Sequence, residues 1–457
     1  MKDIASMTGL IEPRTLKGFR DYVPEVMIPR EQLMETARRV YRRFGFLPID
    51  TPALEYLEIL AGKGSDETDR QMYRFEHGGK KIGMRFDLTI PLARFVAQHI
   101  GQLGTPFKRY HIAPVWRGEN TQAGRYREFV QCDFDTIGTE SIVADIETAI
   151  VIADLMKEIG VERFQLRMNN RQVLNGLLEK LSLVDKSLAV LRALDKIEKM
   201  GAATVREELL RSGGISDGQA DEILALANIK GDTGSVLNQL SELLRGVELG
   251  LNGVERLRSI AEALISSDLS AERFRIDVTI ARGLDYYTGV VFETTLQDLP
   301  SIGSVCSGGR YDNLAGLYTK QHLPGIGASL GLDRLIAALD QLGKLPRSRS
   351  TAQIFIPFFD ANRLNDYLRL CRIVRDAGWN VELYPEPKKL GVQLKYADDR
   401  GFAIALIAGS DELNAGTCQV KNLPHKISTT AAWGESSEPL LSAITNTMAM
   451  ITGSHLA

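Results

Sequence analysis

Three arginines and a glutamate surround a short polar loop in the stretch KRYHIAPVWRGENTQAGRYREFVQCDFD, residues 108–135. Arg117 and Glu119 precede the loop, whereas Arg125 and Arg127 follow it. The stretch reads as two strands joined by a hairpin loop, and a hairpin brings its two ends together. Planar guanidinium groups that converge in this way suit bidentate recognition of phosphate. We therefore predict a phosphate-binding site at this loop.

The second strand of this hairpin carries a row of hydrogen-bonding groups. Alternation along a strand sends one apolar set to the core, namely Val130, Cys132 and Phe134. The opposite face then holds an aromatic ring and three polar groups, from Phe129, Gln131, Asp133 and Asp135. A solvated strand face is the simplest explanation of such a row. The arginines that converge beside it favour a binding site instead.

An acid and a hydroxyl lie close together in a second segment, KKIGMRFDLTIPLAR, residues 80–94. Its alternation predicts a strand on which Asp87 and Thr89 share one face. Taken alone, the segment could be a half-buried strand with a polar outer face. Placed near Gln131 and Asp135, the two acceptors would suit an ammonium group.

Charged residues also lie between two apolar runs in ARGLDYYTGVVFETTL, residues 281–296. Arg282 and Asp285 stand beside Tyr286 and Tyr287, and Gly289 closes the group. A tyrosine pair is common in strands. Buried charges, by contrast, are tolerated only when they are paired or functional. The next segment, SGGRYDNL, contains a Gly-Gly turn at which the backbone can approach a ligand closely.

Composition describes an ordinary soluble globular chain of two or three domains, because its 457 residues are 44% hydrophobic and 25% charged. The net charge of −3 provides no global basic field, so any contact with nucleic acid must come from local patches. The four cysteines are far apart, which predicts reduced thiols, no structural zinc and a cytoplasmic location. We see no signal peptide and no membrane-spanning apolar run.

The order of expected elements gives the domain boundaries. An amphipathic helix over residues 33–44 ends at Gly45, and FLPIDTPALE follows as a strand that contains Pro52. Because proline donates no ladder hydrogen bond, that strand must lie at an edge or interface. We expect catalytic segments at 1–170 and 272–340, an all-helical insertion at 171–271, a linker at 341–351 and an α/β domain at 352–457.

A basic stretch in the last domain has two interpretations. It contains Lys388, Lys389, Lys395 and Arg400. A solvated helix surface is the default interpretation, and a contact with a phosphate backbone is the sharper one.

These segments together resemble a known family. VWRGE, the loop and RYREF resemble motif 2 of class II aminoacyl-tRNA synthetases, FGFLPIDTP with its helix resembles motif 1, and GLDRL resembles motif 3. Within that class, RGLDYYTG and SGGRYDNL are similar to the two signature peptides of histidyl-tRNA synthetases. MRFDLT is similar to the family's Asp-Leu-Thr variant and differs from its Glu-Gly-Thr one, although an acid and a threonine are kept.

The resemblance implies an α+β fold, with a six-stranded antiparallel sheet flanked by helices and a C-terminal anticodon-binding domain. It also implies a homodimer without a membrane anchor that acts on L-histidine, ATP with Mg²⁺, and tRNA-His. Histidine and ATP would form histidyl-adenylate, from which histidine would pass to the 3′ end of the tRNA. Adenylation would need no general base, because the histidine carboxylate is already ionised.

The resemblance also assigns roles to single residues. Asp87, Thr89 and Gln131 would bind the α-ammonium group of histidine, and Asp135 and Tyr287 would flank its imidazole. The remaining histidine-binding residues would be Arg117, Arg282 and Tyr286. The ATP-binding residues would be Arg117, Glu119, Arg125, Phe129 and Arg334. Arg282 and Arg117 would be catalytic, with Arg282 on the α-phosphate, and no residue is assigned to a metal.

Two alternatives stay open. A non-catalytic paralogue serves as a regulatory subunit of ATP phosphoribosyltransferase, but it usually lacks the anticodon-binding domain and the signature arginines that this chain keeps. Another class II synthetase, for proline or threonine, would share the three motifs without RGLDYYTG.

Overall fold

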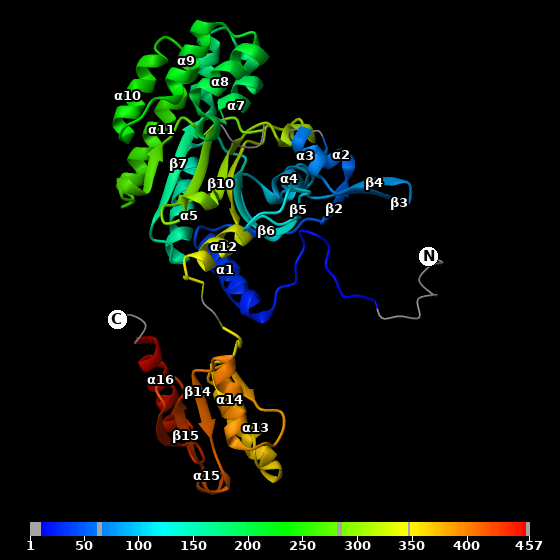
Figure 1. Ribbon diagram of the computed structural model, residues 1–457, viewed down its shortest axis with the longest axis vertical. Coiled ribbons are helices and arrows are strands. Elements are labelled where there is room, and N and C mark those ends of the chain that lie inside the picture. The colour runs from blue at the N-terminus through cyan, green and yellow to red at the C-terminus, as the bar shows by residue number, and fades with distance from the viewer. Residues whose placement is uncertain (1–10, 62–65, 195, 281–285, 346–347, 454–457) are drawn as a thin grey trace. The chain divides into compact units, whose positions relative to one another are not determined.

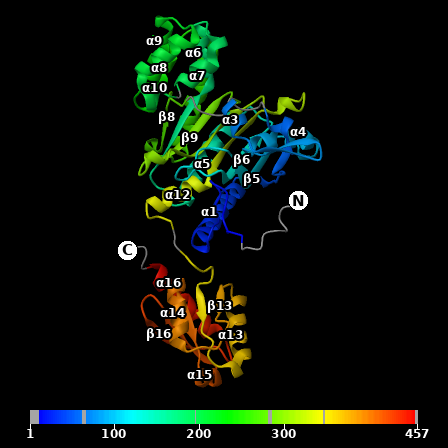
Figure 2. The same cartoon turned by 45° about the vertical axis from the view of Figure 1, so that its right-hand side comes forward.

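The computed structural model describes residues 11–61, 66–194, 196–280, 286–345 and 348–453 (Figures 1 and 2). The chain divides into two compact units. The larger unit comprises residues 1–21 and 32–345, and the smaller one residues 22–31 and 346–457. The linker expected at 341–351 spans the point at which the larger unit ends.

An eight-stranded sheet forms the centre of the larger unit, in the order β1-β5-β6-β11-β10-β9-β7-β8. The central strands, from β5 to β7, are all antiparallel to their neighbours, whereas β1 on β5 and β8 on β7 are parallel edge pairs. This confirms the six-stranded antiparallel sheet and adds a short strand at each edge. The strands are β1 (Leu47–Pro48), β5 (Phe107–Trp116), β6 (Glu128–Ile137), β7 (Phe164–Asn170), β8 (Phe274–Ile276), β9 (Val290–Leu296), β10 (Ser304–Tyr311) and β11 (Gly325–Gly331).

Helices α1 (Pro24–Arg43), α5 (Ile142–Glu158) and α12 (Leu332–Gln341) accompany this sheet (Figure 1). In α1, Tyr41 is fully buried, its ring centroid lies 5.1 Å from that of Phe134 on β6, and its hydroxyl donates to the Cys132 carbonyl at 2.9 Å. Gly45 follows the helix with a φ of +78°. The predicted helix and its glycine stop are therefore confirmed.

The prediction of a strand that contains Pro52 is wrong. Pro52 lies between β1 and β2 (Leu54–Tyr56), and the proline of this segment that lies within a strand is Pro48 at the sheet edge. A proline lacks the N–H that a continuous ladder would need, so the extended segment is interrupted at Pro52.

The strand predicted through Asp87 and Thr89 is also wrong beyond Met84. β4 (Lys80–Met84) pairs with β2 and β3 (Arg74–His77) in a separate three-stranded sheet, and α4 (Thr89–Leu103) follows it. Asp87 Oδ1 accepts a hydrogen bond from the Ile90 N–H at 2.9 Å. An acidic acceptor before the first turn satisfies one of the N–H groups that a helix start leaves open.

Residues 171–266 are helical apart from short connections, as predicted. The helices are α6 (Arg171–Lys180), α7 (Ser187–Leu194), α8 (Ile197–Gly213), α9 (Asp217–Ala227), α10 (Thr233–Leu243) and α11 (Glu248–Ser266). Their buried leucines share one core with the sheet. Gly176 and Gly250 allow α6 to cross α11 closely, because a Cβ on Gly176 would lie 2.5 Å from the Gly250 Cα. Across all the described residues, no helix is both long and apolar enough to cross a membrane.

The smaller unit has its own five-stranded sheet, in the order β13-β12-β14-β15-β16. Its first three strands are parallel and the last two are antiparallel. The strands are β12 (Ile354–Ile356), β13 (Val381–Leu383), β14 (Ile404–Ile407), β15 (Thr417–Asn422) and β16 (Ile427–Ala432), and the helices are α13 (Leu364–Asp376), α14 (Leu390–Arg400), α15 (Ser410–Ala415) and α16 (Glu438–Gly453). This matches the expected alternation of strands and helices.

Candidate active site

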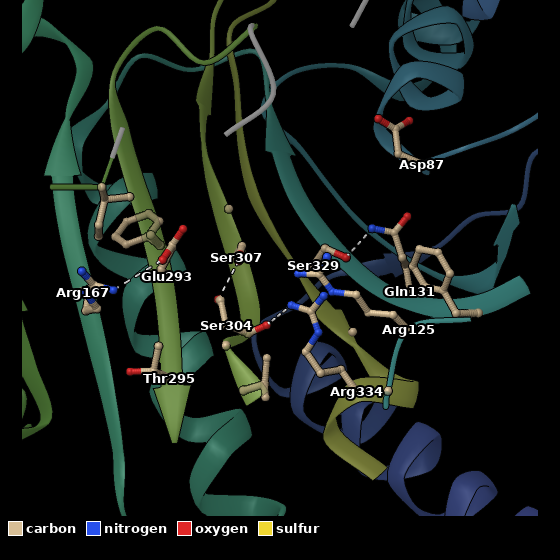
Figure 3. A pocket seen from close by; sticks show the side chains of 18 of the residues that line it. Asp87, Arg125, Gln131, Arg167, Glu293, Thr295, Ser304, Ser307, Ser329 and Arg334 are labelled. Carbon is tan, nitrogen blue, oxygen red and sulfur yellow. Dashed lines mark hydrogen bonds and ion pairs between the residues drawn. The ribbon is translucent and has the colours of Figure 1, made fainter. Parts of the chain in front are cut away.

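A cavity of about 610 Å³ opens in the larger unit, between the β5–β6 hairpin, the start of α4 and the strands β9 to β11 (Figure 3). Most of the predicted site residues line it, namely Asp87, Thr89, Arg117, Glu119, Arg125, Phe129, Gln131, Tyr286, Tyr287 and Arg334. Asp135 is not one of the lining residues. Arg282 and Asp285 lie outside the described residues.

Three arginines form one part of the wall. Arg117 and Arg125 come from the hairpin, and Arg334 comes from α12. Glu119 is the carboxylate beside them, with Oε1 3.7 Å from Arg117 Nη1 and Oε2 3.9 Å from Arg125 Nη1. Burial, and next the charge of Arg125, lower the pKa of Arg334. A cluster with this excess of cations suits a polyanionic ligand such as a polyphosphate.

The hairpin loop lies against α12 because of Gly124. Its φ is +70°, and a Cβ there would lie 3.0 Å from the Arg334 Cα. The N–H of Arg117 donates to the Arg127 carbonyl at 2.9 Å and closes the base of the loop. Arg127 differs from the other predicted cations, because its Nε donates to the Glu119 carbonyl at 3.2 Å and it does not line the cavity. Its role is to hold the loop.

Buried acceptors form another part of the wall. Asp87 and Gln131 are only 2% and 9% exposed. Gln131 Nε2 donates to Ser329 Oγ at 2.8 Å (Figure 3), whereas Gln131 Oε1 and Asp87 Oδ2 have no hydrogen-bond partner among the described residues. Burial raises the pKa of Asp87, and the Ile90 N–H and Arg117 oppose that effect. Acceptors kept dry and unpaired suit a ligand that brings its own donors, such as an ammonium group.

Two aromatic rings stand near these acceptors. Tyr286 and Tyr287 meet edge to face, with centroids 5.1 Å apart. A Cβ on Gly309 would come within 3.0 Å of the Tyr287 ring, so the glycine in β10 leaves room for the tyrosine. The Gly-Gly segment therefore makes space for a side chain of the site.

Asp135 lies in a buried ion pair. Its Oδ2 is 2.6 Å from Nη2 of Arg109 on β5, and its Oδ1 accepts from the Tyr311 hydroxyl. Burial raises the pKa of Asp135, and Arg109 and then Tyr311 counteract that rise. The carboxylate is thus held in place by two protein groups.

Sequence reasoning gave no role to Arg109, Tyr311 or Ser329. Arg109 is completely buried and lies directly opposite Asp135 in the register of the hairpin. Tyr311 lies in SGGRYDNL, but the partner of its hydroxyl, Asp135, is on another strand. The neighbouring Arg310 pairs with Asp145 on α5, Nε to Oδ1 at 2.9 Å, and is structural.

Arg167 and Glu293 lie on the side of the cavity opposite Asp87 (Figure 3). Arg167 Nη1 is 3.8 Å from Glu293 Oε2, and Arg167 Nε is 2.8 Å from Asp277 Oδ2. Sequence reasoning had not singled out this pair either.

The fold and the cavity define a class II aminoacyl-tRNA synthetase. The features of that class are the antiparallel sheet, the arginine-bearing hairpin on it, and the further arginine at the start of α12. The sequence profile described as histidyl-tRNA synthetase matches residues 18–335, and the one described as anticodon binding domain matches residues 354–438. The chain belongs to the histidyl-tRNA synthetase family.

Known proteins agree with this placement. A histidine–tRNA ligase of Rhodopirellula baltica is 62% identical over 95% of this chain and 99% of its own length, and one of Wolinella succinogenes is 43% identical over 91% and 95%. The crystal structure of histidyl-tRNA synthetase from a Nostoc species superimposes with a TM-score of 0.85 at 34% identity, covering 93% of this chain and 97% of that one.

A structure from Bacillus halodurans is described as an ATP phosphoribosyltransferase regulatory subunit/histidyl-tRNA synthetase. It shares the fold, with a TM-score of 0.73 at 23% identity, and the match covers 88% of this chain and 100% of that one. The 62% identity to a ligase, over nearly the full length of both chains, favours an enzyme over the regulatory subunit. These findings support histidine–tRNA ligase activity for this chain.

Proposed function

We propose that histidine and ATP occupy two halves of the same cavity. The observation that carries this assignment is the segregation of its polar groups: cations at the hairpin and α12, and unpaired acceptors at β6 and the start of α4. An amino acid presents an ammonium group, and ATP presents phosphates. The unpaired acceptors match the ammonium group of the amino acid, and the arginines match the phosphates of ATP.

In the histidine half, Asp87, Thr89 and Gln131 bind the α-ammonium group. Tyr287 and Asp135 face the imidazole, with Tyr286 packed beside them. Because Asp135 already bonds to Arg109 and Tyr311, its role on the imidazole requires a geometry in which the ring approaches Oδ1 or Oδ2 alongside those partners. A polar pocket of this kind rejects other side chains by leaving its own groups unpaired.

In the nucleotide half, Arg117, Arg125 and Arg334 bind the phosphates, Phe129 stacks on the adenine and Glu119 lies near its amino group. Mg²⁺ usually keeps several waters and binds phosphate oxygens with one or two carboxylates. Glu119 and Glu293 line the cavity, and no described cluster of three or more acidic, histidine or cysteine residues could form a separate metal cage. The residues therefore fit an ion that arrives with ATP and neutralises phosphate charge.

The chemistry is then positioning and charge neutralisation. A carboxylate oxygen of histidine forms a bond to the α-phosphorus, and the bond to pyrophosphate breaks with its electron pair on the leaving oxygen. Arg117 stabilises charge on the phosphate, and the resemblance to the family implies the same role for Arg282. In the second step, the terminal ribose hydroxyl of the tRNA attacks the acyl carbon and loses its proton. The bond from the acyl carbon to the phosphate oxygen breaks with its electron pair on that oxygen, and AMP leaves.

The assembly and the partner surface are also proposed. We propose a cytoplasmic homodimer formed through the motif 1 region, where the apolar residues Leu47, Leu54 and Tyr56 are exposed. The smaller unit binds the tRNA anticodon, since it matches the anticodon-binding profile. Its basic stretch, Lys388, Lys389, Lys395 and Arg400, is exposed.

Matched substitutions test the two halves. Histidine-dependent ATP–pyrophosphate exchange should show a raised KM for histidine in Gln131→Ala and a raised KM for ATP in Arg125→Ala, each with the other KM nearly unchanged. Equal effects of both substitutions on both constants would contradict the two-half assignment. Running the exchange with proline and threonine in the wild-type protein checks that histidine alone is activated.

A further inference from the structure

Asp133 is a buried carboxylate to which the reaction assigns no role. It is 2% exposed and lies on β6 between Gln131 and Asp135, with its side chain on the same face of the strand. It does not line the cavity. One of its oxygens, Oδ1, has no hydrogen-bond partner among the residues that the structure describes. Leaving a buried carboxylate only partly satisfied is costly, so its presence calls for an explanation.

A chain of hydrogen bonds connects Asp133 to the cavity. Ser329 lies directly opposite Asp133 on the neighbouring strand β11, and its side chain hydrogen-bonds to the Asp133 carboxylate. The same Ser329 hydroxyl accepts from Gln131 Nε2 at 2.8 Å (Figure 3). An ionised carboxylate can only accept, so the serine hydroxyl must donate to Asp133 and accept from the glutamine. The direction of every bond in the chain follows from the charge of Asp133.

That direction determines which atom of Gln131 faces the ligand. With Nε2 committed to Ser329, Oε1 is the free end of the amide, and Oε1 is without a partner in the described part of the chain. An amide oxygen accepts from an ammonium group, whereas an amide NH₂ would repel it. We propose that Asp133 is a positioning residue for the amino acid, which through Ser329 holds the Gln131 oxygen toward the α-ammonium group. This inference rests on the proposed role of Gln131.

A neutral Asp133 would reverse the chain. A protonated carboxyl can donate to Ser329 Oγ, whose proton then turns to Gln131, and the amide rotates to present its NH₂ group to the cavity. Burial raises the pKa of Asp133 to about 7, and the charge of Arg109 opposes that rise. The two arrangements are therefore both within reach near neutral pH.

Charged and titratable groups surround Asp133, and burial raises the pKa of Asp87 and of Asp135 as well. Arg109 on β5 and Arg85 after β4 are cations, and Asp135 and Asp87 are acids that raise its pKa. His111, opposite Asp133 on β5, is neutral because burial and Arg109 lower its pKa to about 3. Cys306 on β10, Tyr287 and Tyr41 also stay neutral, because burial raises the pKa of each.

The sign of the pH effect follows. Asp133 is ionised above its pKa and protonated below it, so the histidine-binding arrangement is lost as the pH falls. At pH 6, one unit below a pKa of about 7, only about one-tenth of the enzyme would hold the ionised form, which raises the apparent KM for histidine about tenfold relative to pH 8. The KM for ATP should not follow this change.

The decisive experiment measures the KM for histidine and for ATP at pH 6 and pH 8 by pyrophosphate exchange in wild type, Asp133→Asn and Ser329→Ala. We expect Asp133→Asn to raise the KM for histidine at pH 8 and to lose the wild-type pH dependence. The imidazole of free histidine also titrates near pH 6, but it contributes equally in both proteins. Ser329→Ala breaks the same hydrogen-bond chain and leaves Asp133 in place. It therefore provides the test if Asp133→Asn does not fold.

Two controls make the outcome specific. Thr294→Val changes a buried hydroxyl of β9 that does not line the cavity, and it should keep the wild-type profile. Imidazolepropionate lacks the α-amino group, so calorimetry should find its affinity unchanged by Asp133→Asn. A wild-type KM and pH profile in both Asp133→Asn and Ser329→Ala would overturn the inference if Gln131→Ala still raises the KM for histidine. If Gln131→Ala has no effect, the proposed role of Gln131 fails instead.

Discussion

Gln131 in the larger unit and Gln393 in the smaller one are both buried, but their amide groups have different partners. Gln393 accepts from the Phe358 N–H at 2.7 Å and donates to the carbonyls of Phe358 and Lys388, each at 2.6 Å. Gln131 donates to Ser329 alone, and its oxygen has no partner in the described chain. One amide is satisfied by the fold, and the other is left for a ligand.

The same contrast holds for charge. The smaller unit buries Arg30 on α1, but the buried polar residues of its described segment 348–453, namely Gln393, Asn422 and Thr447, are all neutral. The larger unit buries arginines and aspartates around its cavity, among them Asp87, Arg109 and Asp135. Burying a charge lowers the free energy of unfolding. The larger unit therefore gives up some stability around its cavity, where the charged groups are available to a ligand.

Removing the most deeply buried cation should have the largest effect. Arg109→Ala leaves Asp135 as an uncompensated buried charge, which costs about 3–5 kcal/mol of unfolding free energy. Urea denaturation would measure that loss, and pyrophosphate exchange should fall with it. Arg349→Ala is the control, because Arg349 pairs at the surface with Glu25 at 2.7 Å. Equal stability of the two variants would contradict the contrast between the units.

Removing the smaller unit should separate the two reaction steps. A chain that ends at Leu345 should keep histidine-dependent pyrophosphate exchange, since all the cavity residues precede that point. Charging of tRNA should fall about a hundredfold, which corresponds to a loss of about 2.8 kcal/mol of binding free energy. Initial charging rates at several tRNA concentrations measure this. If truncated and full-length proteins charge equally well, the tRNA-binding assignment fails.

Neutralising Asp135 tests the histidine half. Asp135→Asn replaces an acceptor oxygen by an NH₂ group and removes the charge that Arg109 faces. Losing a hydrogen bond to a charged group costs about 1.5–3 kcal/mol, so the KM for histidine should rise about 10- to 100-fold and the KM for ATP far less. Steady-state exchange with each reactant varied in turn gives both constants. A change in the ATP constant alone would move Asp135 to the nucleotide half.

Gln393→Leu should have the smallest effect and should spare catalysis. It leaves backbone groups of Phe358 and Lys388 unpaired, at a cost of about 1–3 kcal/mol to the smaller unit. Thermal unfolding should report the loss while pyrophosphate exchange stays at the wild-type rate. A fall in exchange equal to that of a cavity variant would remove the distinction between the two glutamines.

The sequence by itself determined the family, the antiparallel sheet, the helix that ends at Gly45 and most of the residues around the cavity. These follow from local patterns: motif residues at fixed spacing, alternation along β6 and helical periodicity in α1. The alternation correctly placed Cys132 and Phe134 in the core. It also placed Gln131, Asp133 and Asp135 together on the other face.

Only the tertiary structure decided whether that second face meets water. Alternation separates two faces but does not reveal what covers them, and here both are buried. Asp87 and Thr89 reach the cavity at the start of α4. The residues alternate as in a strand, but the hydrogen bond from the Ile90 N–H to Asp87 stabilises the start of a helix instead. The partners Tyr311 and Ser329 lie on strands distant in sequence, and Arg109 lies on the neighbouring hairpin strand β5. Their contacts with β6 depend on strand register, which no local pattern specifies.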